Sequence, residues 1–137
     1  MHRRSFIKKS CITCMGFAGA TMLLESCGSS LPLYKTAQQN NLLTVPIEKF
    51  SGTLMTIRSA SLENDILLVK KQDVYKALYL KCTHEGIGLT ATSKQIVCAA
   101  HGSLFDFDGK VLKEPALRPL KEFQTEISNG NIIIHLT

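Results

Sequence analysis

A chain of 137 residues is long enough for one small domain and too short for two. Its formal net charge of +5 overstates how basic that domain is, because four of the sixteen lysines and arginines, and one of the eleven acidic residues, fall within the first 26 residues. The rest of the chain carries +2, so composition gives no indication of a nucleic-acid partner.

The first 26 residues have the pattern of an export signal. A basic segment, RRSFIKK at residues 3–9, precedes an uncharged apolar run over residues 10–24 that is shorter than the roughly 20 residues needed to span a bilayer. The paired arginines resemble the twin-arginine signal, which exports proteins already folded. An ordinary secretory signal is the alternative. We therefore expect an exported protein on the periplasmic side of the cell envelope.

The end of the apolar run predicts a membrane anchor. LLESC, at residues 23–27, resembles the lipobox of bacterial lipoproteins, which would make Cys27 the lipidated first residue of the mature chain. A plain cysteine beyond an ordinary cleavage site is the alternative. The segment that follows is polar and without apolar periodicity, so residues 27–41 are predicted to be a flexible tether between the lipid and the fold.

Residues 42–137 are predicted to form one all-β domain. Short apolar runs rich in β-branched and aromatic residues alternate with turn residues, and no stretch has a helical period. Asp108-Gly109 and Asn129-Gly130 are typical of tight β-hairpin turns. The pattern favours a small antiparallel sandwich or barrel. The predicted strands cover residues 42–50, 52–58, 65–71, 74–82, 94–99, 103–107, 110–112, 122–128 and 131–137.

Two short motifs carry the chemistry of this domain. The first is C-x-H and the second is C-x-x-H, and each follows a predicted strand and enters a loop that contains glycine, Gly86 or Gly102. Glycine allows backbone to pass close beside a ligand, so two such loops can converge on one point. Two thiolates and two imidazoles at one point form a metal site. The candidate ligands are Cys82, His84, Cys98 and His101.

Two other interpretations use the same residues. Two cysteines and two histidines also bind zinc tetrahedrally, although a zinc site usually begins with two cysteines separated by two to four residues. Cys82 and Cys98 are the only cysteines of the predicted domain, so in an exported protein they could instead form a disulfide.

The motifs, CTHEG and CAAHGSLFD, resemble the two sequence boxes of Rieske 2Fe-2S proteins. The resemblance implies an antiparallel β-sandwich or barrel with a small cluster-binding subdomain over residues 42–137. It also implies a 2Fe-2S cluster whose inner iron is held by Cys82 and Cys98 and whose outer iron is held by His84 and His101. The implied function is electron transfer, as an anchored carrier or as the small redox subunit of a larger oxidoreductase. No nucleophile or organic-cofactor motif accompanies the cluster, so we expect no turnover of substrate by this chain alone.

Other positions refine the resemblance. The quinol-oxidising branch of the family has a disulfide at the positions of Ile87 and Ala100, so this chain resembles the disulfide-free, ferredoxin-like branch. Ser103 keeps the hydroxyl that donates to a bridging sulfide in high-potential members. Phe105 stands where those members have a tyrosine and has no hydroxyl to donate. Pro115 resembles the proline of the loop that covers the cluster.

Overall fold

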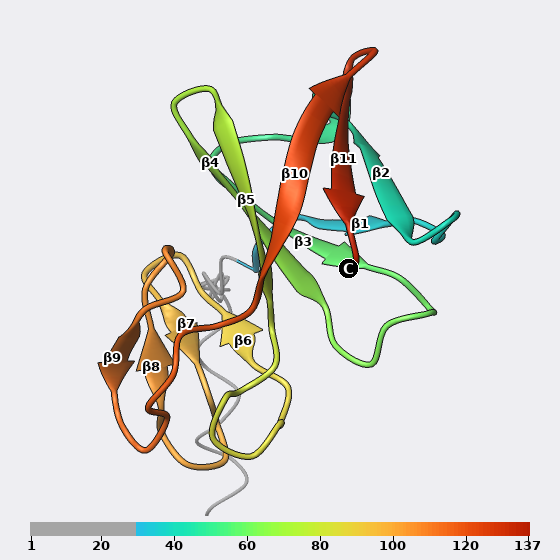
Figure 1. The fold of residues 1–137 in the computed structure, drawn as a ribbon. Helices are drawn as coiled ribbons and strands as arrows, with labels where there is room; N and C mark the ends of the chain where they lie inside the picture. The colour runs from blue at the N-terminus through green and yellow to red at the C-terminus, as the bar shows by residue number, and fades with distance from the viewer. Residues whose placement is uncertain (1–29) are drawn as a thin grey trace, which may run out of the picture.

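The structure is a computed structural model that describes residues 30–137, and these residues form two β-sheets, the larger above the smaller in Figure 1. Within this range the one helical element is the 3-10 turn η1 (Ile47–Lys49). The larger sheet has, in spatial order, β1 (Leu33–Lys35), β3 (Leu54–Arg58), β4 (Ile66–Lys71), β5 (Val74–Tyr79), β10 (Glu122–Ser128), β11 (Asn131–His135) and β2 (Leu42–Pro46). The smaller sheet has β6 (Thr90–Ala91), β7 (Ile96–Val97), β8 (Leu104–Phe105) and β9 (Val111–Lys113). The predicted all-β class is confirmed.

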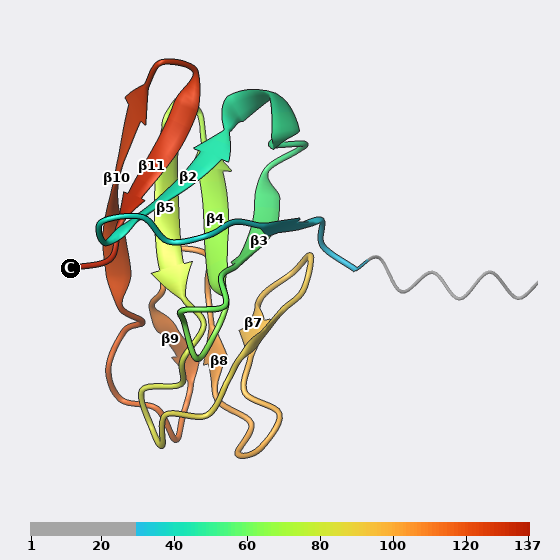
Figure 2. The ribbon, with the colours of Figure 1, turned by 90° about the vertical axis from the view of Figure 1, so that its right-hand side faces the viewer.

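The larger sheet curves until its two edges nearly meet (Figure 2). All its strand pairs are antiparallel except that of β1 with β3, which is parallel. The hydroxyl of Thr36, just after β1, donates to the carbonyl of Thr44 in β2 at 3.1 Å and so links the two edges. The predicted hairpin between β10 and β11 turns at Asn129 and Gly130, both with positive φ. The sheet is therefore a nearly closed barrel.

The larger sheet encloses the first of two hydrophobic cores. Alternate residues of its strands point inward, because successive side chains of a strand face opposite sides of the sheet. Each fully buried aliphatic side chain of this kind contributes roughly 1.5–3 kcal/mol. The buried members are Leu43, Val45, Met55, Ile57, Ile66, Leu68, Tyr75, Ala77, Phe123, Ile132 and Ile134.

The second core lies between the larger sheet and the smaller one. Strand β4 serves both cores, since Leu68 faces the first while Leu67 and Val69 face the second. This double burial explains why β4 reads as a continuous apolar run rather than an alternating one. The other buried members of the second core are Leu78, Leu80, Cys82, Leu89, Ile96, Cys98, Phe105, Ala116 and Leu120.

The N-terminal boundary of the fold differs from the sequence prediction. Residues 33–35, predicted as part of a flexible tether, form β1, and the amide of Thr56 donates to the carbonyl of Pro32 at 2.8 Å. Tyr34 packs against the first core and Leu31 against the second. The tether prediction is therefore wrong for this segment. A three-residue edge strand gives too short a pattern to be recognised, and its pairing is determined by β3.

The remaining strand predictions differ from the structure mainly at their ends. The strand predicted over 74–82 ends at Tyr79, where the chain turns into a loop, and β6 was not predicted. No helix among residues 30–137 is long and apolar enough to cross a membrane. The predicted export signal and Cys27 lie outside the described residues.

Candidate metal centre

The first motif forms a tight loop after β5. The amide of Cys82 donates to the carbonyl of Ile87 at 2.7 Å, and the amide of Gly86 donates back to the carbonyl of Cys82 at 2.8 Å. Gly86 has a φ of +74°, a conformation that residues with a Cβ rarely adopt. The loop therefore closes on Cys82, with His84 at its exposed tip.

The second motif repeats this construction. The amide of Cys98 donates to the carbonyl of Ser103 at 2.9 Å, and the amide of Gly102 donates to the carbonyl of Cys98 at 2.9 Å. The φ of Gly102, +78°, is nearly that of its counterpart in the first loop. Each loop thus begins with a cysteine and returns to it through a glycine four residues later. The spacing C-x-x-x-G, present in both motifs, is the sequence signal of this shared geometry.

Burial separates the four predicted ligands into two pairs. Cys82 and Cys98 are 2% and 0% exposed and belong to the same core, and both are free thiols. His84 and His101 are exposed, with ring centroids 5.0 Å apart and ring planes at 86°. The disulfide interpretation is therefore wrong, because the two cysteines are not joined. The arrangement has sulfur donors inside and imidazole donors outside.

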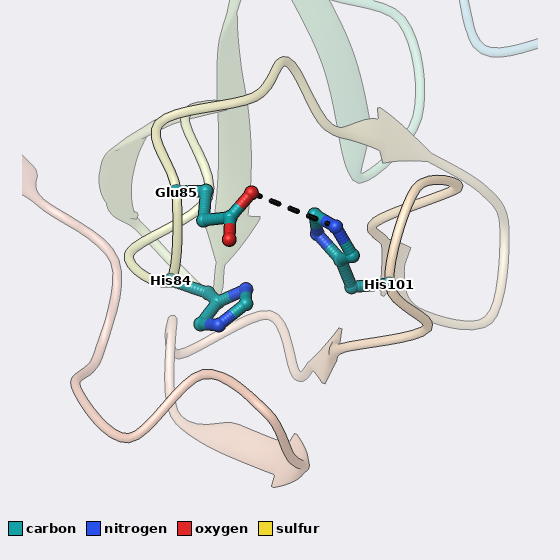
Figure 3. A group of neighbouring side chains, drawn as sticks. All are labelled: His84, Glu85 and His101. Atoms are coloured by element: carbon teal, nitrogen blue, oxygen red, sulfur yellow. Dashed lines mark ion pairs between the residues drawn. The ribbon is translucent and has the colours of Figure 1, made fainter.

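A carboxylate accompanies the two histidines. Ligand atoms of His84, Glu85 and His101 lie within 4.8 Å of one another, and the Glu85 carboxylate is 3.5 Å from Nε2 of His101 (Figure 3). Glu85 was not among the predicted site residues, since an acidic residue in a loop carries no distinctive sequence signal. The three side chains come from both ligand loops, which confirms that the loops converge at one surface.

The other predicted residues surround the two loops. Ser103 is fully buried, and its Oγ accepts a hydrogen bond from the amide of Ala116 at 3.0 Å. Phe105 is also fully buried, in the same core as Cys98. Pro115 directly precedes Ala116, so the loop over residues 114–119 lies against the second ligand loop. Thr83 and Arg118, which sequence analysis did not single out, connect this loop to the first ligand loop.

This donor set fits a cluster of two irons better than a single ion. The thiols are buried at the starts of two similar loops, whereas the imidazoles stand exposed at their tips, so the set has two faces of different polarity. Thiolate and imidazole are the ligands of mixed-ligand 2Fe-2S centres. The fold and the site together define a β-barrel redox domain with a metal centre at one end.

The particular family follows from comparison with known proteins. Residues 47–124 match the family described as the Rieske 2Fe-2S domain. This match covers more than half of the chain, and the chain therefore belongs to the Rieske 2Fe-2S domain family. Its cofactor is a 2Fe-2S cluster. The zinc interpretation finds no support in these comparisons.

Similar proteins are known from sequence. The chain is 26% identical over 76 residues to the cytochrome b6-f complex iron-sulfur subunit of Chlorobaculum tepidum, a match that covers 54% of this chain and 42% of that protein. It is 32% identical over 88 residues to the cytochrome b6-f complex iron-sulfur subunit 2 of a Nostoc species, covering 61% and 49%. The chain thus spans less than half the length of either relative.

A solved structure supports the fold. A chain from the complex of reduced oxygenase and oxidized ferredoxin in carbazole 1,9a-dioxygenase is 21% identical, with a TM-score of 0.53, over 72% of this chain and 95% of that one. At this identity the likeness concerns the fold, which is the Rieske fold implied by the sequence resemblance.

Proposed function

We propose that this chain is an electron-transfer protein in which Cys82 and Cys98 hold the inner iron and His84 and His101 hold the outer iron. The observation that carries the proposal is the pairing of buried thiols with adjacent exposed imidazoles on two similar loops. Exposed imidazoles bring the cluster close to the surface that a redox partner contacts. The thiols lie on the side that faces the second core.

The mixed ligand set has an electrostatic consequence. Two ferric ions, two sulfides, two thiolates and two neutral imidazoles sum to zero charge in the oxidised state, whereas four thiolates would give −2. Adding an electron to a neutral centre is easier, so mixed ligation raises the reduction potential, to roughly −150 to +300 mV in this class. The proposed ligands therefore suit a carrier of higher potential than a plant-type ferredoxin.

Metal and sulfide analysis tests the proposed ligands. The purified protein should contain about two irons and two acid-labile sulfides per chain. His84→Cys should shift the visible spectrum toward that of an all-thiolate cluster or prevent assembly. One zinc and no iron in protein from its native host would overturn the proposal.

The absence of a loop disulfide supports a ferredoxin-like role. Ile87 and Ala100 occupy the positions of the bridging cysteines, and among residues 30–137 both cysteines are free. We infer a carrier, or the small redox subunit of a larger oxidoreductase, that passes electrons to a partner protein. A mild thiol reductant under anaerobic conditions should leave the visible spectrum unchanged. Rapid bleaching would contradict a disulfide-free site.

We also propose export and anchoring through Cys27. The twin-arginine pattern supports this location, because a protein that carries a cluster built in the cytoplasm must cross the membrane folded. The chain covers six residue steps from Cys27 to Leu33, where β1 begins, and these reach at most about 21 Å. A tether that extended to Leu42, as the sequence predicted, would cover fifteen steps and reach about 52 Å. The domain would then remain close to the membrane.

Mass spectrometry of the membrane-bound protein tests the anchor. The expected result is an acylated N-terminal Cys27. Intact Arg3 and Arg4 on that form would overturn the lipoprotein proposal and leave the electron-transfer proposal untouched.

A further inference from the structure

The side chains of Glu85 and His101 are in contact at the exposed end of the candidate metal centre. Oε2 of Glu85 lies 3.5 Å from Nε2 of His101, and the two side chains are 55% and 37% exposed (Figure 3). Glu85 follows His84 in the first ligand loop, so its carboxylate reaches a proposed ligand of the second loop. Within residues 30–137, Glu85 is the only acidic residue within 4 Å of a ring nitrogen of either ligand histidine.

The nitrogen of His101 that faces the carboxylate decides which nitrogen is left for iron. Nε2 faces Glu85, and a carboxylate attracts an N–H, so the proton of the neutral ring is favoured at Nε2. Nδ1 then carries the lone pair that a metal needs. A carboxylate beside the other N–H of a ligating imidazole makes the ring a stronger donor. At 3.5 Å the contact is longer than an ordinary hydrogen bond, so Glu85 acts chiefly through its charge.

We propose that Glu85 is a positioning residue that acts through His101 and lowers the reduction potential of the site. This inference rests on the proposed function and its ligand set. The oxidised centre is neutral with these ligands and the reduced centre is one unit more negative, so a nearby carboxylate opposes the added electron. Stronger donation from the imidazole favours ferric iron and acts in the same direction. The chain is therefore a carrier of lower potential than the same site with a neutral residue at position 85.

A second carboxylate and imidazole on this chain provide a matched control. Oε1 of Glu126 on β10 lies 3.6 Å from Nε2 of His135 on β11, and these side chains are 57% and 35% exposed. The separation and the exposure are nearly those of Glu85 and His101, but this pair belongs to the larger sheet. Glu126→Gln therefore removes the same charge from the same kind of contact without altering a ligand loop.

The midpoint potential is the main measurement. By protein-film voltammetry of the full-length protein at one pH and low salt, Glu85→Gln should favour reduction roughly three- to tenfold, a rise of about 28–59 mV at about 59 mV per tenfold. Glu85→Lys changes the charge by two units and should give about twice that rise. Glu85→Asp keeps the charge and should stay closer to the parent than Glu85→Gln does. Glu126→Gln should leave the potential nearly unchanged.

Ionic strength separates an effect of charge from a disturbance of structure. Salt screens exposed charges, because the Debye length falls from about 10 Å at 0.1 M to about 3 Å at 1 M. The difference in potential between Glu85→Gln and the parent should therefore shrink as the salt concentration rises. Iron content, the visible spectrum and far-UV circular dichroism should be the same in the two proteins. A disturbance of structure would alter the visible spectrum and would persist at high salt.

Four results would overturn the inference: a Glu85→Gln potential equal to or below the parent's, an equal rise in Glu126→Gln, a difference that salt does not reduce, or failure of both Glu85→Gln and Glu85→Lys to assemble a cluster. The last result counts against the inference because a change of charge alone leaves assembly intact. A parent protein that contains no 2Fe-2S cluster would instead count against the proposed function. Iron and sulfide analysis of the parent therefore distinguishes the two failures.

Discussion

The larger sheet and the cluster-binding subdomain are stabilised in different ways. The strands of the larger sheet have three to seven residues, and their alternating side chains fill a core of their own. The strands β6–β9 of the smaller sheet have only two or three residues, and their core is completed by side chains of β4 and β5. The ligand loops depend on glycines at positive φ, on backbone hydrogen bonds within each loop, and on side-chain hydrogen bonds to the loop over residues 114–119. The barrel is thus a support, and the site is built from irregular backbone attached to it.

The largest expected effect is that of truncating a large buried side chain in the second core. Phe105 is fully buried in the same core as Cys98, so Phe105→Ala should destabilise the domain by about 3–5 kcal/mol. Iron content should fall because the core that contains both cysteines loses a large side chain. Leu68→Ala, in the first core, is the comparison and should cost about 2–5 kcal/mol. At a temperature where both variants remain folded by far-UV circular dichroism, Leu68→Ala should keep more iron. Equal iron loss in the two variants would mean that cluster retention depends on the first core as much as on the second.

The next effect concerns the hydroxyl of Ser103. Its oxygen accepts from Ala116, which leaves its own proton for the cluster sulfur that the resemblance implies. Ser103→Ala should cost about 1–3 kcal/mol, because the buried amide of Ala116 loses its acceptor. It should also lower the midpoint potential, by about 40 mV for each kcal/mol by which the lost bond favoured the reduced state. Protein-film voltammetry measures this shift, and an unchanged potential would show that the proton is not directed at the cluster.

Glycine substitutions compare the two regions with matched strain. Gly102 in the second ligand loop and Gly130 in the β10–β11 turn have φ values of +78° and +73°, and a Cβ at either position would meet no atom within 4 Å. Replacing either with alanine should therefore cost a similar amount, about 1–2 kcal/mol. Thermal unfolding should show similar losses, whereas only Gly102→Ala should accelerate cluster loss. Acceleration by Gly130→Ala as well would mean that strain in the barrel reaches the site.

The sequence predicted the parts of this molecule that depend on local patterns. The hairpin turn at Asn129-Gly130, the longer strands and the convergence of the two ligand loops follow from turn chemistry, alternation and motif spacing. Strand β1 was missed because its position depends on β3, more than twenty residues away. The contact between Thr83 and Arg118 joins residues 35 positions apart and has no local sequence signature. What sequence could not predict is therefore the set of contacts that depends on the assembled fold.

The smallest expected effect lies at the junction of the two regions. Asp108, predicted only as a hairpin residue, lies 2.6 Å from Nζ of Lys71 on β4 and 3.3 Å from Nζ of Lys76 on β5. Hydrogen bonds from Lys71 and then from Lys76 lower the pKa of Asp108 below its usual value. Beside it, the carbonyl of Gly109 accepts from the amide of Leu120 at 2.8 Å. The turn between β8 and β9 is thus attached to the larger sheet by charge, and to the segment that leads into β10 by a backbone hydrogen bond.

The lowered pKa of Asp108 makes this attachment sensitive to acid. A carboxyl group with a depressed pKa in the folded state contributes stability above its unfolded pKa, about 3.9, and loses it as the pH falls through the folded value. Asp108→Asn should therefore lower the unfolding temperature slightly near neutral pH, and this difference should shrink below pH 4. The effect should also decrease at high salt, because the group is partly exposed and such pairs are screened. Thermal unfolding at several pH values measures it. A difference that persists unchanged at pH 3 would show that the effect of the substitution does not come from the charge of the Asp108 carboxylate.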